Sequence, residues 1–101
     1  MDKLKEKEVE AYSVEVKIKN CLGLHARPSA VFVQTASKFK SDICIEKNGD
    51  IVNGKSILGL LMLAAGQGSI IKISASGADD AQSAVSALVK LVEQDCEFNE
   101  I

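Results

Sequence analysis

The stretch Gly23-Leu24-His25-Ala26-Arg27-Pro28 organises this sequence and holds its only histidine, arginine and proline. A run of alternating apolar residues precedes it and an apolar run with helical spacing follows it, which predicts a strand-to-helix turn. Backbone N–H groups lack partners in the first turn of a helix, and the helix dipole is positive there. We therefore expect the turn to stabilise an anion.

His25 is the candidate nucleophile at this turn. A neutral imidazole is available near pH 7, because its unperturbed pKa is about 6.5, and it can accept a phosphoryl group transiently. Arg27 would add charge-assisted donors to the phosphate, provided that His25 lies outside the helix proper. Pro28 is tolerated in a first turn, but whether the helix begins at Ala26 or at Pro28 stays open. A histidine that merely faces solvent or caps the helix is the alternative.

Composition limits the function classes. The 101 residues fit one domain with an aliphatic core, and a net charge of −2 gives no footprint for nucleic acid or an anionic membrane. No apolar run approaches the roughly 20 residues that span a bilayer, and the N-terminus lacks a secretory apolar segment. The three cysteines, Cys21, Cys44 and Cys96, form no metal-ligand set, so we expect no metal site. We expect them to be buried free thiols, which are typical of a reducing compartment, and we therefore expect a cytoplasmic protein.

The pattern of the chain predicts four strands and three helices after a charged extension over residues 1–11. Their order, β-α-β-β-α-β-α, indicates an α+β two-layer sandwich of one sheet and one helical layer. Asp79 and Asp80 are expected in the first turn of the last helix, whose core stripe is Ala81, Ala84, Val85, Leu88 and Val92. The expected segments are a strand from Tyr12, a helix over about 26–38, strands over 42–47 and 51–53, a helix over 57–65, a strand over 69–76 and a last helix from about 79.

The second helix is too apolar for a surface helix of its length. Ser56 is its expected N-cap, because the hydroxyl can accept a hydrogen bond from a free backbone N–H. One stripe would face the core and a second would form an exposed patch, the usual mark of a docking surface. A wholly buried helix is the alternative. The core stripe comprises Ile57, Leu60, Leu63 and Ala64, and the surface stripe Leu58, Leu61, Met62 and Ala65.

Three stretches resemble the HPr family, the histidine-containing phosphocarriers of the bacterial phosphoenolpyruvate-dependent sugar phosphotransferase system. They are GLHARPSA at 23–30, NGKSILGLL at 53–61 and GQGSIIKISASGADD at 66–80, and the similarity extends from about Tyr12 to about Glu93. The resemblance implies an HPr-like domain over residues 12–101. It also implies an open-faced antiparallel sheet in the order 1-4-2-3, covered by three helices.

The resemblance further implies the roles of the site residues. His25 would be phosphorylated by Enzyme I at the expense of phosphoenolpyruvate and discharged to IIA domains of sugar permeases, while Arg27 helps to hold the phosphoryl group. The chain would then be a stoichiometric carrier rather than an enzyme, with no cofactor, and we expect a monomer. Partner contacts are expected at Ala26, Ile57, Leu58, Leu61 and Met62.

Ser56 lies in a Lys55-Ser56-Ile57 motif that an ATP-dependent HPr kinase/phosphorylase modifies in many members of that family. Phosphate at an N-cap is compatible with the helix dipole, and its charge beside an apolar patch would impede some partners. Three alternatives stay open. Ser56 merely caps the helix, the chain serves the regulatory nitrogen-type branch, or it is a binding module controlled by Ser56.

Overall fold

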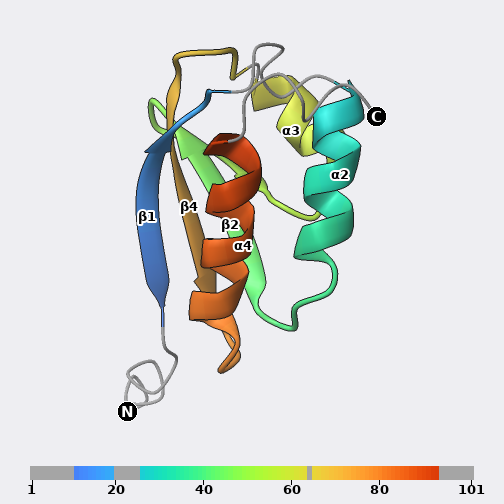
Figure 1. Cartoon of the computed structure of the whole chain (residues 1–101), viewed down its shortest axis with the longest axis vertical. Coiled ribbons are helices and arrows are strands. Elements are labelled where there is room, and N and C mark those ends of the chain that lie inside the picture. Colours follow the sequence, from blue (N-terminus) through green and yellow to red (C-terminus); the bar gives the residue numbers. More distant parts are fainter. Residues whose placement is uncertain (1–10, 20–25, 64, 94–101) are drawn as a thin grey trace.

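The computed structural model describes residues 11–19, 26–63 and 65–93, and it contains the seven expected elements in the expected order (Figure 1). Their bounds differ from the predicted ones by two residues or fewer. The expected division between an extension and a domain after residue 11 stays a prediction, because residues 1–10 lie outside this range. The elements are β1 (Tyr12–Lys17), α2 (Ala26–Ala36), β2 (Asp42–Lys47), β3 (Asp50–Asn53), α3 (Ile57–Leu63), β4 (Ile70–Ser76) and α4 (Ala81–Glu93).

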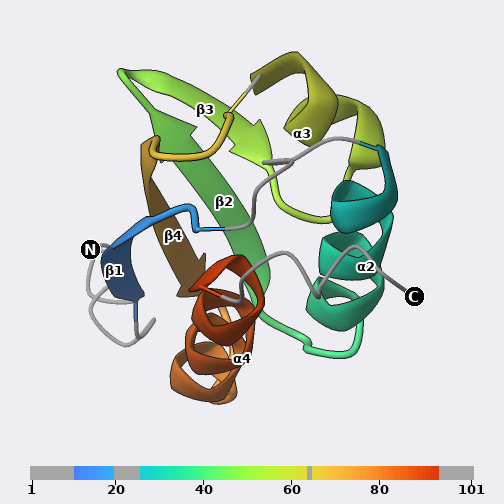
Figure 2. The same ribbon diagram turned by 45° about the horizontal axis from the view of Figure 1, so that its top comes forward.

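The strands form one antiparallel sheet in the order β1-β4-β2-β3, which confirms the predicted fold class and strand order. Within the described residues, helices α2, α3 and α4 cover one face of this sheet, and no described helix covers the other face (Figures 1 and 2). Burial alternates along β4, where Ile71, Ile73 and Ala75 face the helices and Lys72 is exposed. This is the pattern of a strand with one buried face.

The core lies between the sheet and the helices and is aliphatic apart from Phe32. Its centre is made by isoleucines of β2 and β4, of which Ile45 and Ile73 are fully buried. All five residues of the predicted stripe on α4 are buried, so that prediction is confirmed.

The expectation that the cysteine thiols are buried is wrong for Cys44, whose thiol is exposed on β2. It lies on the open face because the side chains of β2 alternate, and Ile43 and Ile45 take the core side. Cys21 and Cys96 lie outside the described residues.

The start of α4 differs from the prediction and has a structural role. The helix begins at Ala81, so Asp79 and Asp80 precede its first turn. The carbonyl of Asp80 accepts the N–H of Ala84 at 2.9 Å, which makes Asp80 the N-cap residue. Its carboxylate accepts hydrogen bonds from Ser41 Oγ at 2.6 Å and from the N–H groups of Lys40 and Ser41 at 2.7 and 3.0 Å.

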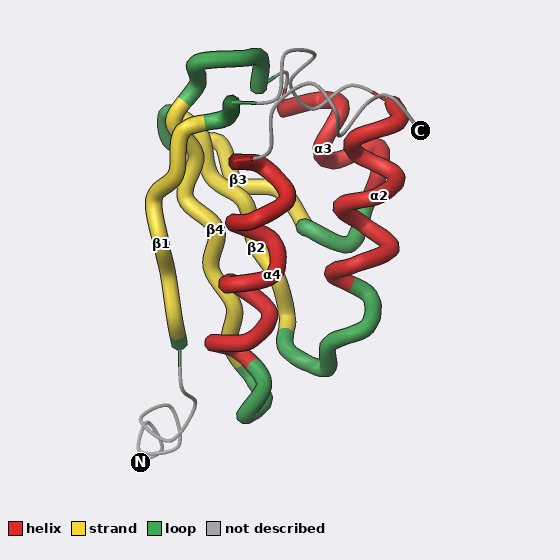
Figure 3. Tube along the Cα trace, in the orientation of Figure 1, coloured by secondary structure: helices red, strands yellow, loops and turns green. Residues whose placement is uncertain are grey.

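We call this set of bonds the Asp80 clamp, because it joins the start of α4 to the loop between α2 and β2. Figure 3 shows this loop and the start of α4 at the same end of the sheet. The hydrogen bond from the Ser41 side chain, followed by that from the Lys40 backbone, lowers the pKa of the Asp80 carboxyl group. Ser41 is fully buried, so the clamp also satisfies a polar side chain in the interior.

Candidate functional site

The site begins at the first turn of α2. The helix starts at Ala26, which settles the question that the sequence left open in favour of Ala26 over Pro28. Pro28 and Ser29 are buried in the first turn, where the missing N–H of proline needs no partner. His25 and the side chains of Ala26 and Arg27 lie outside the described residues, so their predicted roles stay predictions.

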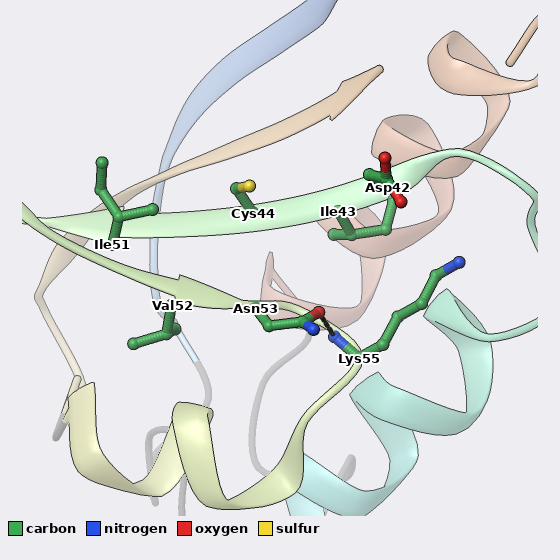
Figure 4. Close-up of a pocket in the computed structure, with 7 residues that line it drawn as sticks. All are labelled: Asp42, Ile43, Cys44, Ile51, Val52, Asn53 and Lys55. Carbon is green, nitrogen blue, oxygen red and sulfur yellow. Dashed lines mark hydrogen bonds between the residues drawn. The ribbon is translucent and has the colours of Figure 1, made fainter. Parts of the chain in front are cut away.

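Helix α3 packs against α2, and local hydrogen bonds form its start. Figure 4 shows the turn that precedes the helix, with the bond between Asn53 and Lys55. Ser56 Oγ accepts the N–H of Gly59 at 3.0 Å, and the Ser56 carbonyl accepts the N–H of Leu60 at 3.1 Å. The prediction of Ser56 as N-cap is therefore confirmed. Just before it, Asn53 Oδ1 accepts the N–H of Lys55 at 2.8 Å, a turn that asparagine favours.

The Lys55 side chain fixes this turn to the rest of the molecule. Its ammonium group donates to the carbonyl of Phe39, beyond the C-terminal end of α2, at 2.9 Å. The sequence carried no signal for this contact, because the two residues are 16 apart and belong to different loops. The consequence is that the Lys55 ammonium is held against the carbonyl of Phe39.

The exposed face of α3 is apolar, as predicted. Leu60 and Leu63 are buried, whereas 66% of Leu58 and 73% of Met62 are exposed to solvent. The interpretation of a wholly buried helix is therefore wrong. We call the exposed set the α3 patch, and it consists of Ile57, Leu58, Leu61 and Met62.

The predicted stripes are wrong at two residues, one in α3 and one in the turn that follows it. Ile57 was expected in the core but is 42% exposed, because it is the first residue of the helix and Leu60 and Leu63 take the core side. Ala65 was expected at the surface but is buried, because the helix ends at Leu63 and the chain then leaves the helical path. Ala64 lies outside the described residues.

A cavity of about 350 Å³ lies beside β2 and β3 and is bordered by the Lys55 turn (Figure 4). It is open to solvent and contains charged, polar and apolar groups in one small space. No group of three histidine, cysteine or acidic side chains that could bind a metal is present within 11–19, 26–63 and 65–93. The lining residues are Asp42, Ile43, Cys44, Ile51, Val52, Asn53 and Lys55.

None of the helices in the described part of the chain combines the length and the apolar character that crossing a bilayer requires.

Comparisons with known proteins agree with this geometry. The family model described as "PTS HPr component phosphorylation site" matches residues 12–94. A phosphocarrier protein HPr from Neisseria meningitidis is 53% identical over 77 residues, which cover 76% of this chain and 85% of that protein. The crystal structure of a phosphocarrier protein HPr from Bacillus anthracis superimposes with a TM-score of 0.79 at 46% identity, covering 82% of this chain and 98% of that one.

A third similar structure is that of Crh, named as a catabolite repression protein, from Bacillus subtilis. It has a TM-score of 0.65 and 44% identity, and the match covers 76% of this chain and 87% of that one. That protein is described as a dimer with a swapped domain. The expectation of a monomer for this chain therefore has no support from its relatives.

Proposed function

Because the chain belongs to the HPr family of the phosphotransferase system, we propose that it carries a phosphoryl group on His25 between Enzyme I and the IIA domains of sugar permeases. The observation that carries the proposal is the family match over 12–94, which includes a histidine directly before the first residue of α2. We place this relay in the cytoplasm, where phosphoenolpyruvate is available to Enzyme I.

The chemistry follows from the start of α2. A ring nitrogen of neutral His25 would form a bond to phosphorus while the bond from phosphorus to the donor protein breaks, and the reverse would occur on the acceptor. The positive end of the α2 dipole and the Arg27 guanidinium would stabilise the phosphate oxygens. Donation requires moderate stabilisation, since a phosphate bound too tightly would not be released. The chain is thus a carrier and not a catalyst.

The α3 patch supports the docking role of this face. It lies on a helix packed against α2, and exposed apolar groups of this size commonly mark a protein contact. We propose that Ala26 and the α3 patch together contact Enzyme I and the IIA domains. The position of the patch would bring each partner to the histidine turn.

The experiment is phosphorylation of the full chain by Enzyme I with labelled phosphoenolpyruvate. We expect one acid-labile phosphoryl group per chain, its loss in His25→Ala, and its transfer to a sugar-permease IIA domain. Ser83→Ala, at an exposed position of α4, is the control that should be labelled normally. Labelling that persists in His25→Ala would refute the assignment. Transfer only to a nitrogen-type IIA protein would place the chain in the regulatory branch.

A second candidate function is a binding module controlled by phosphorylation of Ser56. The observation that favours it is that Ser56 directly precedes the α3 patch and is partly exposed. The Lys55 ammonium donates to the Phe39 carbonyl, so it is engaged away from Ser56. A phosphate at Ser56 would add about two negative charges, and we expect this charge to act on partners at the patch. We propose that HPr kinase/phosphorylase and ATP modify this residue.

This second function has its own test. Incubation with the kinase and ATP should add an acid-stable phosphate that Ser56→Ala abolishes and Ser83→Ala retains. Pull-downs with Ser56→Asp and His25→Ala then separate the two functions. Binding that follows the charge at residue 56 and survives loss of the histidine supports the module. Binding that ignores residue 56 leaves Ser56 as a helix cap alone.

A further inference from the structure

The turn between β3 and α3 is fixed by its own backbone and by β2. The N–H of Gly54 donates to the carbonyl of Ile43 on β2 at 2.8 Å, and Gly54 is buried. Within the turn, the carbonyl of Asn53 accepts the N–H of Ser56 at 3.1 Å, and the side-chain oxygen of Asn53 accepts the N–H of Lys55 at 2.8 Å. These bonds hold the backbone that leads into Ser56.

The Lys55 side chain connects this turn to a distant part of the chain. Its ammonium group donates to the carbonyl of Phe39 at 2.9 Å, in a partly buried position beyond the C-terminal end of α2. Figure 4 shows the side chain extending away from the turn. A hydrogen bond from a charged donor is stronger than one between neutral groups, and partial exclusion of water strengthens it further. The bond therefore fixes the turn relative to the end of α2.

The hydroxyl of Ser56 is held by the helix that follows the turn. Its Oγ accepts the N–H of Gly59 at 3.0 Å, and Ser56 is half-buried. A serine hydroxyl has two lone pairs, so the cap uses one of them and leaves the second for a reaction. The position of Oγ depends on the cap and also on the turn before it. A loosened turn would let Oγ leave the position in which the cap holds it.

We propose that Lys55 is a positioning residue for phosphorylation of Ser56, which it serves by binding the Phe39 carbonyl and not by contacting the kinase. This inference rests on the proposed control by Ser56. In the reaction, Ser56 Oγ forms a bond to the γ-phosphorus of ATP, the bond from that phosphorus to the leaving oxygen of ADP breaks, and the hydroxyl proton passes to a base of the kinase. The step requires Oγ at a defined place relative to ATP, and a misplaced reacting group lowers the rate strongly.

Steady-state phosphorylation by HPr kinase/phosphorylase and ATP tests this role with two substitutions of Lys55. Lys55→Met keeps a long apolar side chain but cannot donate, and kcat should fall about fivefold or more with KM nearly unchanged. Lys55→Arg can donate to the same carbonyl and should recover most of the rate. Lys72→Met, at an exposed position of β4, removes the same charge elsewhere and should be phosphorylated like the wild type.

Substitutions of Asn53 separate position from charge. Asn53→Ala removes the acceptor for the Lys55 N–H but leaves the lysine side chain unchanged, so it should lower kcat in the same way. Asn53→Asp retains an acceptor oxygen and should recover the rate. The double variant of Lys55→Met and Asn53→Ala should lose less than the product of the two single losses, because both act on one turn. Amide exchange measured by NMR should be faster at the Gly59 N–H in both single variants.

The outcomes separate this role of Lys55 from the proposed control by Ser56. A wild type that takes up no phosphate on Ser56 removes that control, and the role of Lys55 with it. If the wild type is phosphorylated, a rise in KM alone for Lys55→Met with normal kinetics for Asn53→Ala shows that the kinase reads the lysine charge, and the positioning role is wrong. Normal kinetics in both variants contradict it as well, and so does a lower kcat without faster exchange at Gly59. Circular dichroism of each variant verifies the fold before rates are compared.

Discussion

Helices α3 and α4 cover the same face of the sheet but are held in different ways. Every residue of the core stripe of α4 is buried, and its N-cap, Asp80, uses its carboxylate to hold a loop that is 39 and 40 residues away in sequence. The hydroxyl of Ser56, the N-cap of α3, accepts the N–H of Gly59 in its own first turn, and most of the large side chains of α3 are exposed. The comparison teaches that α4 contributes mainly to stability, whereas α3 leaves apolar surface available for binding.

Leucine truncations in the two helices give the largest contrast. Leu88→Ala removes a fully buried side chain of α4 and should lower the free energy of unfolding by about 2–5 kcal/mol. Leu58→Ala, on the exposed face of α3, should change it by about 0.5 kcal/mol or less. Urea unfolding measures both.

The same pair separates stability from binding. Leu58→Ala should weaken Enzyme I binding about fivefold or more if the α3 patch is a docking surface, because truncation of a central contact typically costs more than about 1 kcal/mol. Titration calorimetry at a temperature where both variants are folded gives the comparison. Equal losses of stability in the two variants would contradict the division between the helices.

Loss of the Ser41 side-chain bond in the Asp80 clamp should have the next largest effect on the free energy of unfolding. Ser41→Ala deletes the hydroxyl that donates to Asp80 from a fully buried position, and it should lower the free energy of unfolding by about 1–2 kcal/mol. Ser83→Ala, on the exposed face of α4, is the matched control and should be close to neutral. Thermal unfolding followed by circular dichroism compares them. A neutral Ser41→Ala would show that the backbone bonds to Asp80 suffice.

Local sequence patterns predicted most of the features that distinguish α3 from α4, but not the Asp80 clamp. Helical spacing identified the buried residues of α4, and the serine before an apolar run identified the N-cap of α3, because both signals act within a few residues. The carboxylate of Asp80 instead binds a loop brought near by the fold, which no local pattern reveals. Gly54 is similar, since a Cβ there would lie 2.5 Å from Cγ2 of Ile43, and this contact between β2 and the turn after β3 is not shown by any local pattern.

Loss of the α3 cap should have a smaller effect. Ser56→Ala removes the acceptor for the Gly59 N–H and should cost about 1 kcal/mol, while Ser56→Asp should retain most of the stability because aspartate also caps helices. Chemical denaturation of both variants tests this. If Ser56→Asp is as unstable as Ser56→Ala, the cap depends on the geometry of the hydroxyl, and an added charge would disturb the helix as well as its partners.

The pH dependence of stability should also distinguish the N-caps of α3 and α4, and this is the smallest of the expected effects. The pKa of Asp80 is lowered in the folded protein, first by the Ser41 side chain and then by the Lys40 backbone, whereas an unfolded aspartate has a pKa of about 3.9. The unfolded state therefore takes up the proton first as pH falls, so the contribution of the clamp is complete above about pH 5 and is lost progressively as the pH falls below that. Wild type should lose stability between pH 5 and 3 more steeply than Ser41→Ala, while Ser56→Ala should keep the wild-type slope because a serine hydroxyl does not titrate there. Parallel slopes for all three proteins would mean that protonation of Asp80 is not linked to folding, and the clamp would then stabilise α4 without making it sensitive to acid.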